Sequence, residues 1–435
     1  MTTRARQQAA LTLGRVLQQQ RSLSGLLPDA IEKVELKDKA LLQELCYGTL
    51  RWYPKLQFLL NQLLSKALKP KDSDIQGLLL IGIYQLLYMR IPDHAVISET
   101  VDVCRALKKQ WATKLVNGVL RNMQRQQASL LAEFAGEAPV QYAHPKWLIK
   151  AIAEAWPEQA EDIYAANNNH PPFTLRLNTA LTQREDYLKH LPENLSASAN
   201  AFSETGLTLA QACDVFELPG FTEGKISVQD EAAQLAAPLL GAENGERILD
   251  ACCAPGGKTG HILESATELK LQALDSDAKR LVRVQENLDR LQRQATLICG
   301  DALDLAQWWD GETYDRILVD APCSGTGVIR RHPDIKLLRK PADIDKLAAL
   351  QGSILDALWQ TLKPGGRLVY ATCSIMPKEN TETVEAFLQR TSDAKEDVLN
   401  VAWGMPQVCG RQLLPQNNGH DGFYYAVLSK IAEDN

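Results

Sequence analysis

The sequence predicts an α/β protein: a doubly wound parallel sheet at the C-terminal end, preceded by an all-helical bundle and a small α+β module. Three patterns predict this order. Apolar residues recur at three- and four-residue spacing from Arg4 to about Leu131, helical and alternating patterns then mix, and short apolar runs alternate with helical patterns from Val228 onward. We expect domains at residues 1–135, 140–227 and 228–435.

The first two regions are bounded by turn-forming residues. Breakers such as Ser24-Gly25, Lys69-Pro70 and Pro92-Asp93 separate the N-terminal helices, which predicts a compact bundle. The middle module is predicted from a helix over Trp147–Ala155, a strand over Phe173–Asn178, a helix over Arg184–Leu191 and short strands up to Ser227.

The C-terminal region predicts five parallel strands. The candidates are Arg247–Asp250, Leu271–Asp275, Thr296–Cys299, Arg316–Asp320 and Arg367–Thr372. Helical patterns lie between them, for example at Asp277–Leu291 and Ile344–Leu362, and such alternation is typical of a parallel sheet covered on both faces. We expect the last apolar segment, Gly422–Leu428, to be an antiparallel edge strand.

Charge is distributed unevenly along the 435 residues. The whole chain carries −6, but residues 1–130 hold 19 Lys+Arg against 10 Asp+Glu, and the remainder holds 28 against 43. A basic N-terminal region on an acidic body favours contact with a polyanion such as nucleic acid.

Composition favours a cytoplasmic protein with no metal and no membrane segment. The longest apolar run, Gly77 to Tyr84, is too short to span a bilayer, and the N-terminus does not resemble a signal peptide. The nine cysteines include no CxxC pair, which argues against a disulfide framework and a structural zinc site. A cysteine with a chemical role is therefore more readily a nucleophile than a metal ligand.

A glycine-rich turn follows the first strand of the sheet. Its residues are Asp250-Ala251-Cys252-Cys253-Ala254-Pro255-Gly256-Gly257-Lys258-Thr259. Glycine at this place lets the backbone approach a ligand closely. The GxxxxGK[ST] spacing of a phosphate loop is absent, because the two glycines are adjacent.

Aspartates mark the ends of four successive strands. Asp250, Asp275, Asp301 and Asp320 follow one another in this way. Parallel strands end at one edge of the sheet, so these carboxylates are expected to share one ligand site. Carboxylates suit a cationic sulfonium cofactor better than a pyrophosphate. Asp275 is placed to accept hydrogen bonds from ribose hydroxyls and Asp301 to lie at an adenine edge, although helix capping accounts for some of these acids.

Two cysteines follow later strands. Cys323 lies in Asp320-Ala321-Pro322-Cys323-Ser324-Gly325, and Cys373 lies in Ala371-Thr372-Cys373-Ser374. A lone cysteine at a strand end is usually a small buried hydrophobe. Two at the same edge favour covalent catalysis by a thiolate. The sequence alone does not rank them, and the Pro-Cys motif of DNA cytosine methyltransferases would favour Cys323 as the nucleophile.

The strings DACCAPGGKT, DAPCSGTGVIRRHPDIK and ATCS resemble those of the RNA 5-methylcytosine methyltransferase family, and the likeness runs through most of residues 140–435. The helical region resembles the NusB fold. This resemblance implies a Rossmann-like methyltransferase domain, S-adenosylmethionine as cofactor, and small-subunit ribosomal RNA as partner of a monomeric enzyme.

The resemblance also assigns roles to residues. It implies that Cys373 is the nucleophile that adds to carbon 6 of a cytosine, that Cys323 helps to release the methylated product, and that Asp320 contacts the base. The cofactor site is implied to comprise Cys252, Cys253, Ala254, Pro255, Gly256, Gly257, Lys258, Asp275, Asp301 and Asp320.

The basic stretch from Val328 to Lys336 directly follows the Cys323 motif. As an isolated charge run it would be a solvated face, but beside a base-modifying site we expect it to contact RNA phosphates. Two other functions remain open: a non-catalytic RNA-binding protein with a vestigial domain, which the intact acids and cysteines disfavour, and the same chemistry on transfer RNA.

Overall fold

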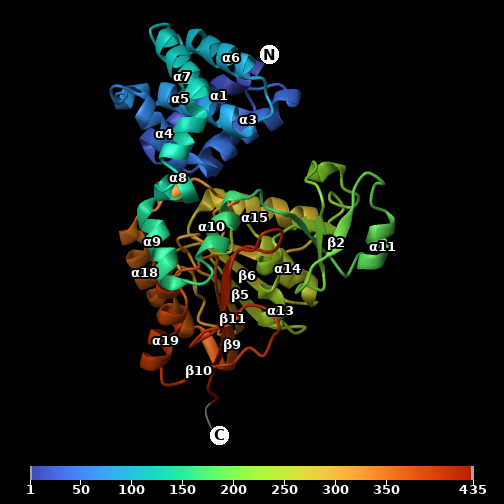
Figure 1. The fold of residues 1–435 in the computed structure, drawn as a ribbon. Coiled ribbons are helices and arrows are strands. Elements are labelled where there is room, and N and C mark those ends of the chain that lie inside the picture. Colours follow the sequence, from blue (N-terminus) through green and yellow to red (C-terminus); the bar gives the residue numbers. More distant parts are fainter. Residues whose placement is uncertain (1, 433–435) are drawn as a thin grey trace. The chain divides into compact units, whose positions relative to one another are not determined.

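The chain folds into two compact units, shown in Figure 1, in a computed structural model that describes residues 2–432. The N-terminal unit consists of the chain up to His170 together with Ile329–Pro341, which we call the crossing segment. The C-terminal unit consists of Pro171–Val328 and the chain from Ala342 onward. The backbone thus leaves the C-terminal unit shortly after Cys323 and returns to it after thirteen residues of the N-terminal unit.

The N-terminal unit is entirely helical over its described residues. Its helices are α1 (Thr2–Gln19), α2 (Leu23–Ile31), α3 (Leu36–Arg51), α4 (Tyr53–Leu63), η1 (Pro70–Asp72), α5 (Ser73–Tyr88), α6 (Asp93–Ala106), α7 (Ala112–Glu133), α8 (Ala138–Tyr142), α9 (Lys146–Ala155), α10 (Ala160–Asn168) and α17 (Ile335–Leu338). Helix α5 is apolar on all sides and forms the centre of the core, with every residue from Gly77 to Leu86 buried.

Two glycines let α1 and α5 pack closely. A Cβ atom at Gly14 would lie 2.9 Å from the backbone nitrogen of Asp74, and one at Gly77 would lie 2.9 Å from the carbonyl oxygen of Ala10. Any side chain at either position would therefore push the two helices apart. The hydrophobic helical pattern read from the sequence accounts for this bundle.

The first part of the C-terminal unit is a small four-stranded antiparallel sheet in the order β2-β3-β1-β4. Its elements are β1 (Phe173–Leu177), α11 (Arg184–Lys189), β2 (Ala197–Ala199), β3 (Gly206–Leu209), η2 (Val215–Glu217) and β4 (Ile226–Val228). Leu175, Leu207 and Ile226 are fully buried in its core. The alternating FTLRLN pattern predicted the central strand.

The larger sheet has the order β11-β12-β13-β9-β8-β5-β6-β7, with β10 paired to β13. Its strands are β5 (Arg247–Ala251), β6 (Lys270–Asp275), β7 (Thr296–Cys299), β8 (Tyr314–Asp320), β9 (Leu362–Thr372), β10 (Ala394–Glu396), β11 (Met405–Pro406), β12 (Arg411–Leu413) and β13 (Phe423–Lys430). Strands β5 to β9 are parallel, and β13 runs antiparallel to β9.

Helices cover both faces of this sheet, as the alternating pattern predicted. Figure 1 shows α13 (Ala236–Leu240), α14 (Gly257–Ser265) and α15 (Ala278–Leu291) on one side and α18 (Pro341–Trp359) and α19 (Thr381–Arg390) on the other. The shorter helices are α12 (Glu231–Gln234), α16 (Leu305–Trp308) and η3 (Pro377–Glu379). The fold class, a Rossmann-like domain after a helical bundle and a small α+β module, is confirmed.

One expectation about the sheet is wrong. The last apolar segment, β13, is antiparallel as expected, but it is not an edge strand, because β9 lies on one side of it and β12 and β10 pair on the other. Its residues from Phe423 to Leu428 are all buried. A continuous apolar run is typical of a strand covered on both faces, so this signal was present in the sequence.

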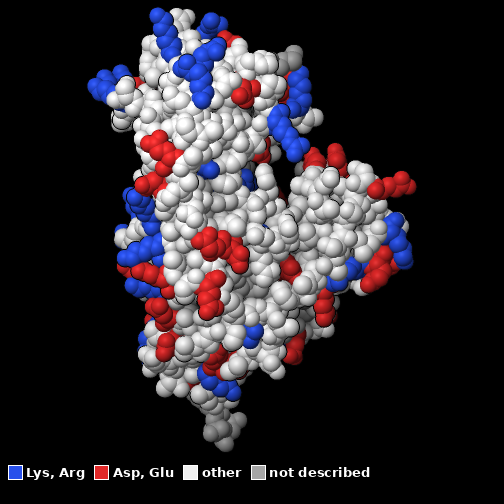
Figure 2. All heavy atoms as spheres, viewed as in Figure 1, with Lys and Arg blue, Asp and Glu red and all other residues white. Residues whose placement is uncertain are grey.

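The strand order reverses at β5, which has β6 on one side and β8 on the other. Chain crossovers leave this strand in opposite directions, so the carboxyl end of β5 is the topological switch point where doubly wound sheets bind ligands. The glycine-rich turn follows β5 directly. Figure 2 shows Lys and Arg side chains over α7 of the helical unit, a helix that contains Lys114, Arg121 and Arg125 against one acid, Glu133.

Candidate active site

The glycine-rich turn has the tight backbone that its composition predicted. Gly256 has a φ of +96°, and a Cβ atom there would lie 3.1 Å from the Cα atom of Val284. Cys252 also adopts a positive φ, at +61°. The backbone N–H of Ala254 donates to Asp275 Oδ2 at 3.2 Å, so the turn after β5 is attached to the end of β6.

Asp275 is almost completely buried, with 3% of its surface exposed. Its Oδ1 atom accepts the backbone N–H of Asp277 at 3.0 Å, and Oδ2 lies 3.3 Å from the Arg280 guanidinium. Asp301 follows β7 and is exposed, and its Oδ1 atom accepts the N–H of Leu303 at 3.0 Å. The alternative that helix capping accounts for these acids is wrong for Asp275 and Asp301: each accepts the N–H of the residue two positions on, and the side chain that caps α15 is that of Asp277.

Asp250 is fully buried at the end of β5. Its Oδ2 atom accepts a hydrogen bond from Thr259 Oγ1 at 2.6 Å, while Oδ1 has no hydrogen-bond partner among the described residues. Burial raises the pKa of this carboxyl to about 7. The charges of Asp320, Asp275 and Asp250, after burial, help to raise the pKa of Cys252 to about 12, which shows that the acids surround the turn.

Lys258 and Asp320 form an ion pair beside the turn. Lys258 Nζ lies 2.7 Å from Asp320 Oδ2, and the two side chains are 11% and 28% exposed. Burial lowers the pKa of Lys258, but the charge and hydrogen bond of Asp320 outweigh burial, so the pKa lies above its ordinary value. Lys258 also lies over the ring of Phe423, 5.2 Å from its centre.

The two candidate cysteines meet. Cys323 Sγ lies 3.3 Å from Cys373 Sγ, and neither thiol is in a disulfide. The backbone of the two loops is joined as well, since Gly327 N–H donates to the Cys373 carbonyl at 2.9 Å. The hydrogen bond to Cys373 and burial hold the pKa of Cys323 well above its usual range. Both causes favour the protonated thiol of Cys323.

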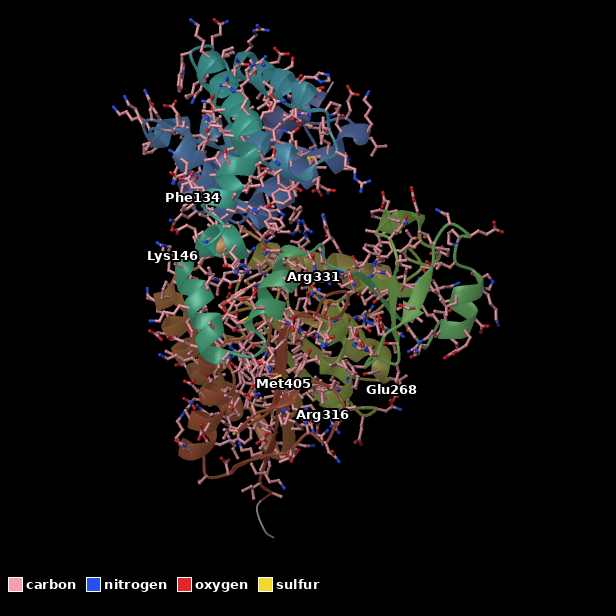
Figure 3. The ribbon with its side chains drawn as sticks, in the orientation of Figure 1. Phe134, Lys146, Glu268, Arg316, Arg331 and Met405 are labelled. Carbon is pink, nitrogen blue, oxygen red and sulfur yellow. The ribbon has the colours of Figure 1, made fainter. Side chains whose placement is uncertain are left out.

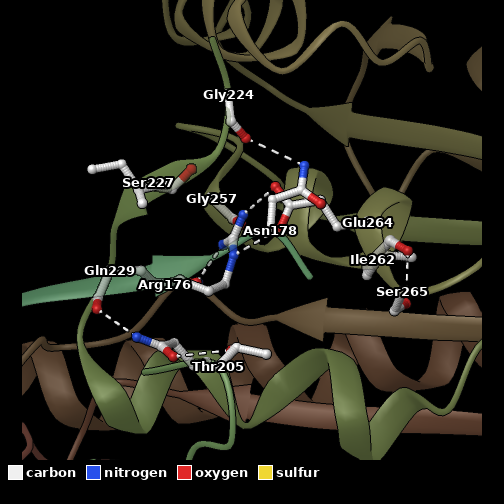
Figure 4. Close-up of polar contacts among 12 residues, drawn as sticks. Arg176, Asn178, Thr205, Gly224, Ser227, Gln229, Gly257, Ile262, Glu264 and Ser265 are labelled. Atoms are coloured by element: carbon white, nitrogen blue, oxygen red, sulfur yellow. Dashed lines mark hydrogen bonds and ion pairs between the residues drawn. The ribbon is translucent and has the colours of Figure 1, made fainter. Parts of the chain in front are cut away.

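A buried arginine that the sequence did not single out braces the turn (Figure 4). Arg176, on β1, is 1% exposed and donates to the Gly257 carbonyl at 2.8 Å. It also donates to Glu264 at 2.8 and 3.1 Å and to Gln229. The small sheet and the start of α14 are thus joined through one guanidinium. The Arg in FTLRLN, charged within an alternating apolar strand, was the available signal.

The sequence also missed Glu379, six residues after Cys373. This carboxylate is completely buried and accepts hydrogen bonds from both cysteine loops. Nothing in the spacing of the cysteine motifs pointed to it.

The expected phosphate contacts of the basic stretch are wrong for two residues. Arg330 and Lys336 are 1% and 2% exposed. The Lys336 ammonium donates to the carbonyls of Arg51 at 2.8 Å and Ala143 at 3.0 Å. Burial, with the nearby charge of Arg51, holds the pKa of Lys336 well below its usual range. The crossing segment, which includes the Arg331 labelled in Figure 3, belongs to the helical unit and not to an open loop.

No cluster of His, Cys, Asp and Glu suited to a metal ion occurs within residues 2–432. Within the same range, no helix combines the length and the apolar composition needed to cross a bilayer.

An acid-lined glycine turn at the switch point of a Rossmann-like sheet defines a cofactor-binding domain. Comparison with known families shows that this domain is a methyltransferase. Residues 237–429 match the family described as 16S rRNA methyltransferase RsmB/F, residues 3–125 match the NusB family, and residues 144–216 match the ferredoxin-like domain of RsmF/B-like methyltransferases.

Curated relatives match along nearly the whole chain. Ribosomal RNA small subunit methyltransferase B of Pseudomonas syringae pv. tomato is 57% identical over 431 residues, which cover 98% of this chain and 96% of that protein. The protein of the same name from Vibrio vulnificus is 50% identical over 425 residues, covering 98% and 99%. The chain therefore belongs to the 16S rRNA methyltransferase RsmB/F family.

Solved structures show the same fold. A methyltransferase homolog protein from Pyrococcus horikoshii has a TM-score of 0.59 at 27% identity, covering 67% of this chain and 97% of that one. The crystal structure of PH0851 has a TM-score of 0.83 at 22% identity and covers 99% of both chains. The second likeness concerns the fold alone.

Proposed function

We propose that this chain methylates carbon 5 of a cytosine in small-subunit ribosomal RNA, using Cys373 as a covalent nucleophile. The observation that carries the proposal is the 3.3 Å approach of the Cys373 and Cys323 sulfur atoms at the same sheet edge as the glycine turn. A methyltransferase acting on oxygen or nitrogen needs no pair of thiols at this place. Methylation of carbon 5 of cytosine needs one thiolate, because carbon 5 is a poor nucleophile until sulfur adds to carbon 6, and a second thiol beside the first can assist release.

The residues present fit S-adenosylmethionine. A buried carboxylate oxygen without a partner, Asp250 Oδ1, suits a cationic group, and Asp275 and Asp301 follow the neighbouring strands. The backbone of Cys252 to Lys258 leaves no room for a side chain at Gly256, which favours close approach of a ligand to the turn. When bound, this cofactor supplies an activated methyl group.

The chain's own residues account for activation of the base. Cys373, as thiolate, forms a bond from sulfur to carbon 6, and the electrons of the carbon 5–carbon 6 double bond become available at carbon 5. Asp320 is proposed to accept a hydrogen bond from the amino group of the base and, once nitrogen 3 has taken up a proton from water as the sulfur adds, a second one from nitrogen 3; that proton neutralises the charge that develops on the ring. Lys258 fixes the Asp320 carboxylate through the 2.7 Å ion pair.

Release requires that carbon 5 lose its proton and that the sulfur–carbon 6 bond break, with the electrons restoring the double bond. Cys323 is proposed to assist this step because its sulfur lies 3.3 Å from that of Cys373: its proton passes to the leaving Cys373 sulfur, and the Cys323 thiolate that results takes the carbon 5 proton. The family resemblance assigns the two roles in this order. Since the two thiols touch, the opposite order would use the same geometry, and the experiment must decide between them.

The substrate must present an unstacked cytosine, because the two thiols are partly enclosed between loops after β8 and β9. We propose that residues 1–135 and 140–227 bind RNA. Two observations support this role for the helical region: the excess of Lys and Arg in residues 1–130, and the basic side chains over α7 in Figure 2. A monomer acting in the cytoplasm, where small subunits are assembled, completes the proposal.

Methylation of purified small-subunit ribosomal RNA tests the proposal. The parent chain with S-adenosylmethionine should protect one cytosine from bisulfite conversion, and Cys373→Ala should protect none. Cys409→Ala is the matched control, since this buried thiol lies outside the site. Transfer of the methyl group to another base, to nitrogen 4, or only to transfer RNA would overturn the proposal.

A further inference from the structure

Glu379 lies beneath the two cysteine loops and is completely buried. It is the last residue of η3, six positions after Cys373. Its backbone carbonyl accepts the hydroxyl of Tyr370, on β9, at 2.7 Å, so its main chain is attached to the sheet. A buried carboxylate is costly unless several donors satisfy it.

Both cysteine loops supply those donors. From the Cys323 loop, the backbone N–H of Ser324 donates at 2.7 Å and its hydroxyl at 2.5 Å. From the Cys373 loop, the hydroxyl of Ser374 donates at 2.5 Å. Ser324 and Ser374 are each the residue directly after a candidate catalytic cysteine, and both are fully buried.

A third element completes the arrangement. Gln351, on α18, donates one hydrogen bond to Glu379 at 3.2 Å and another to the Pro322 carbonyl at 2.9 Å. Thr326 adds a link between the loops, since its hydroxyl accepts the N–H of Ile375 at 3.1 Å. No cation pairs with Glu379 among residues 2–432, so hydrogen bonds alone compensate its burial.

We propose that Glu379 is a positioning residue that sets the contact between the Cys323 and Cys373 thiols by holding Ser324 and Ser374 to one carboxylate. The inference rests on the proposed two-cysteine reaction and adds to it a residue that positions the two thiols. A carboxylate with charged hydrogen bonds to both loops fixes their spacing more firmly than neutral partners, because such bonds are shorter and stronger.

The charge has a second consequence for the thiols. After the hydrogen bond to Cys373, burial and the Cys373 charge, the charge of Glu379 further raises the pKa of Cys323. The negative charge of Glu379 therefore disfavours ionisation of Cys323 and favours its protonated thiol.

The test compares Glu379→Gln with the parent and with the control Glu382→Gln, which makes the same chemical change at an exposed position three residues later. The first readout needs no RNA: rates of iodoacetamide alkylation of Cys323 and Cys373 are measured against pH, with each peptide quantified by mass spectrometry. In Glu379→Gln we expect the midpoint for Cys323 to fall by about one pH unit.

The second readout separates positioning from loss of structure. Methyl transfer should fall on the order of 100-fold, the effect of a misplacement of about 1 Å. S-adenosylmethionine affinity by calorimetry should stay within about twofold, because Glu379 does not contact the turn. If Glu379→Gln is poorly folded, Ser374→Ala replaces it: one bond to the carboxylate is lost, and a smaller change in the same direction is expected in both readouts.

An unchanged alkylation profile and an unchanged rate in a folded Glu379→Gln protein would overturn the inference. So would equal effects of Glu379→Gln and Glu382→Gln. Failure of the proposed function looks different: Cys373→Ala and Cys323→Ala would then both retain full methyl transfer, while the alkylation profiles of the two thiols would still respond to Glu379→Gln.

Discussion

Cys323 and Cys373 are fifty residues apart in the chain, yet their Sγ atoms lie 3.3 Å from each other. The sheet causes this approach, because β8 and β9 are parallel neighbours and each cysteine follows the carboxyl end of its strand. The same edge carries the Lys258–Asp320 pair and the glycine turn after β5. Several measurable consequences arise from this arrangement.

Asp275→Asn should weaken binding of S-adenosylmethionine about 10- to 100-fold, because charged hydrogen bonds contribute about 1.5–3 kcal/mol each. The buried carboxylate also accepts the Ala254 N–H and so orders the turn. Isothermal titration calorimetry measures the effect. Asp289→Asn, an exposed change on α15, is the control. Equal affinities for the two variants would remove Asp275 from the cofactor site.

Cofactor affinity should depend on pH through Asp250, because burial raises the pKa of this carboxyl to about 7. A cationic ligand favours the ionised carboxylate, so binding is fully favoured above pH 7 and each pH unit below the pKa should cost about tenfold in affinity. Calorimetry at pH 7.5 and at about pH 5.5 compares the parent with Asp250→Asn. The variant should bind weakly with little pH dependence. A flat profile in the parent contradicts this role.

The same raised pKa predicts the stability of the unliganded chain. In the unfolded chain this carboxyl ionises near its ordinary pKa of 3.8, whereas in the folded chain it stays protonated up to about pH 7. The folded state then binds the extra proton, so this group makes the free energy of unfolding fall as the pH rises from about 4 to 7. Urea unfolding across that range should show a steeper fall in the parent than in Asp250→Asn.

Arg176→Ala should destabilise the C-terminal unit by about 3–5 kcal/mol, because it leaves the Glu264 carboxylate buried without its cation. Glu264 is 4% exposed. The double variant Arg176→Ala/Glu264→Gln also removes the unpaired Glu264 charge. Urea unfolding should show that it recovers part of the lost free energy of unfolding. Cofactor affinity should fall in Arg176→Ala, because the Gly257 carbonyl loses its donor. If the double variant were no more stable than the single one, the ion pair would have no measurable role.

Lys336→Met should lower the stability of the helical unit and leave the salt dependence of RNA binding unchanged. The Lys336 ammonium satisfies the Arg51 and Ala143 carbonyls, and each unsatisfied buried acceptor costs about 1–3 kcal/mol. A lost phosphate contact would instead reduce the slope of log affinity against log salt by about 1. Lys340→Met, an exposed change in the same segment, is the control. A reduced slope for Lys336→Met would restore the phosphate contact expected from sequence.

The sequence predicted those features of the fold and the site that depend on local residue patterns. Parallel strands were read from apolar runs, and acids such as Asp250 and Asp320 were placed at one edge because every parallel strand ends there. The same reasoning brought Cys323 and Cys373 to one site. Their ranking did not follow, since each cysteine comes directly after a strand of the same sheet edge and only the groups around each thiol, which the fold brings together, distinguish the two.

Long-range partners could not be predicted. Arg176 meets Glu264 eighty-eight residues later, and Lys336 meets the Arg51 carbonyl 285 residues earlier. A basic run such as that around Lys336 has the same composition whether it is buried or solvated, so composition alone favoured the wrong interpretation. The interior position of β13 was readable, because its apolar run is continuous.

The central claim is that Cys373 bonds to the cytosine and Cys323 serves its release. The most direct measurement is denaturing electrophoresis with intact mass spectrometry of Cys323→Ala and Cys373→Ala after incubation with ribosomal RNA and S-adenosylmethionine. Cys323→Ala should remain covalently attached to RNA through Cys373, and Cys373→Ala should form no adduct. A stable adduct of Cys373→Ala, with none of Cys323→Ala, would contradict the assignment.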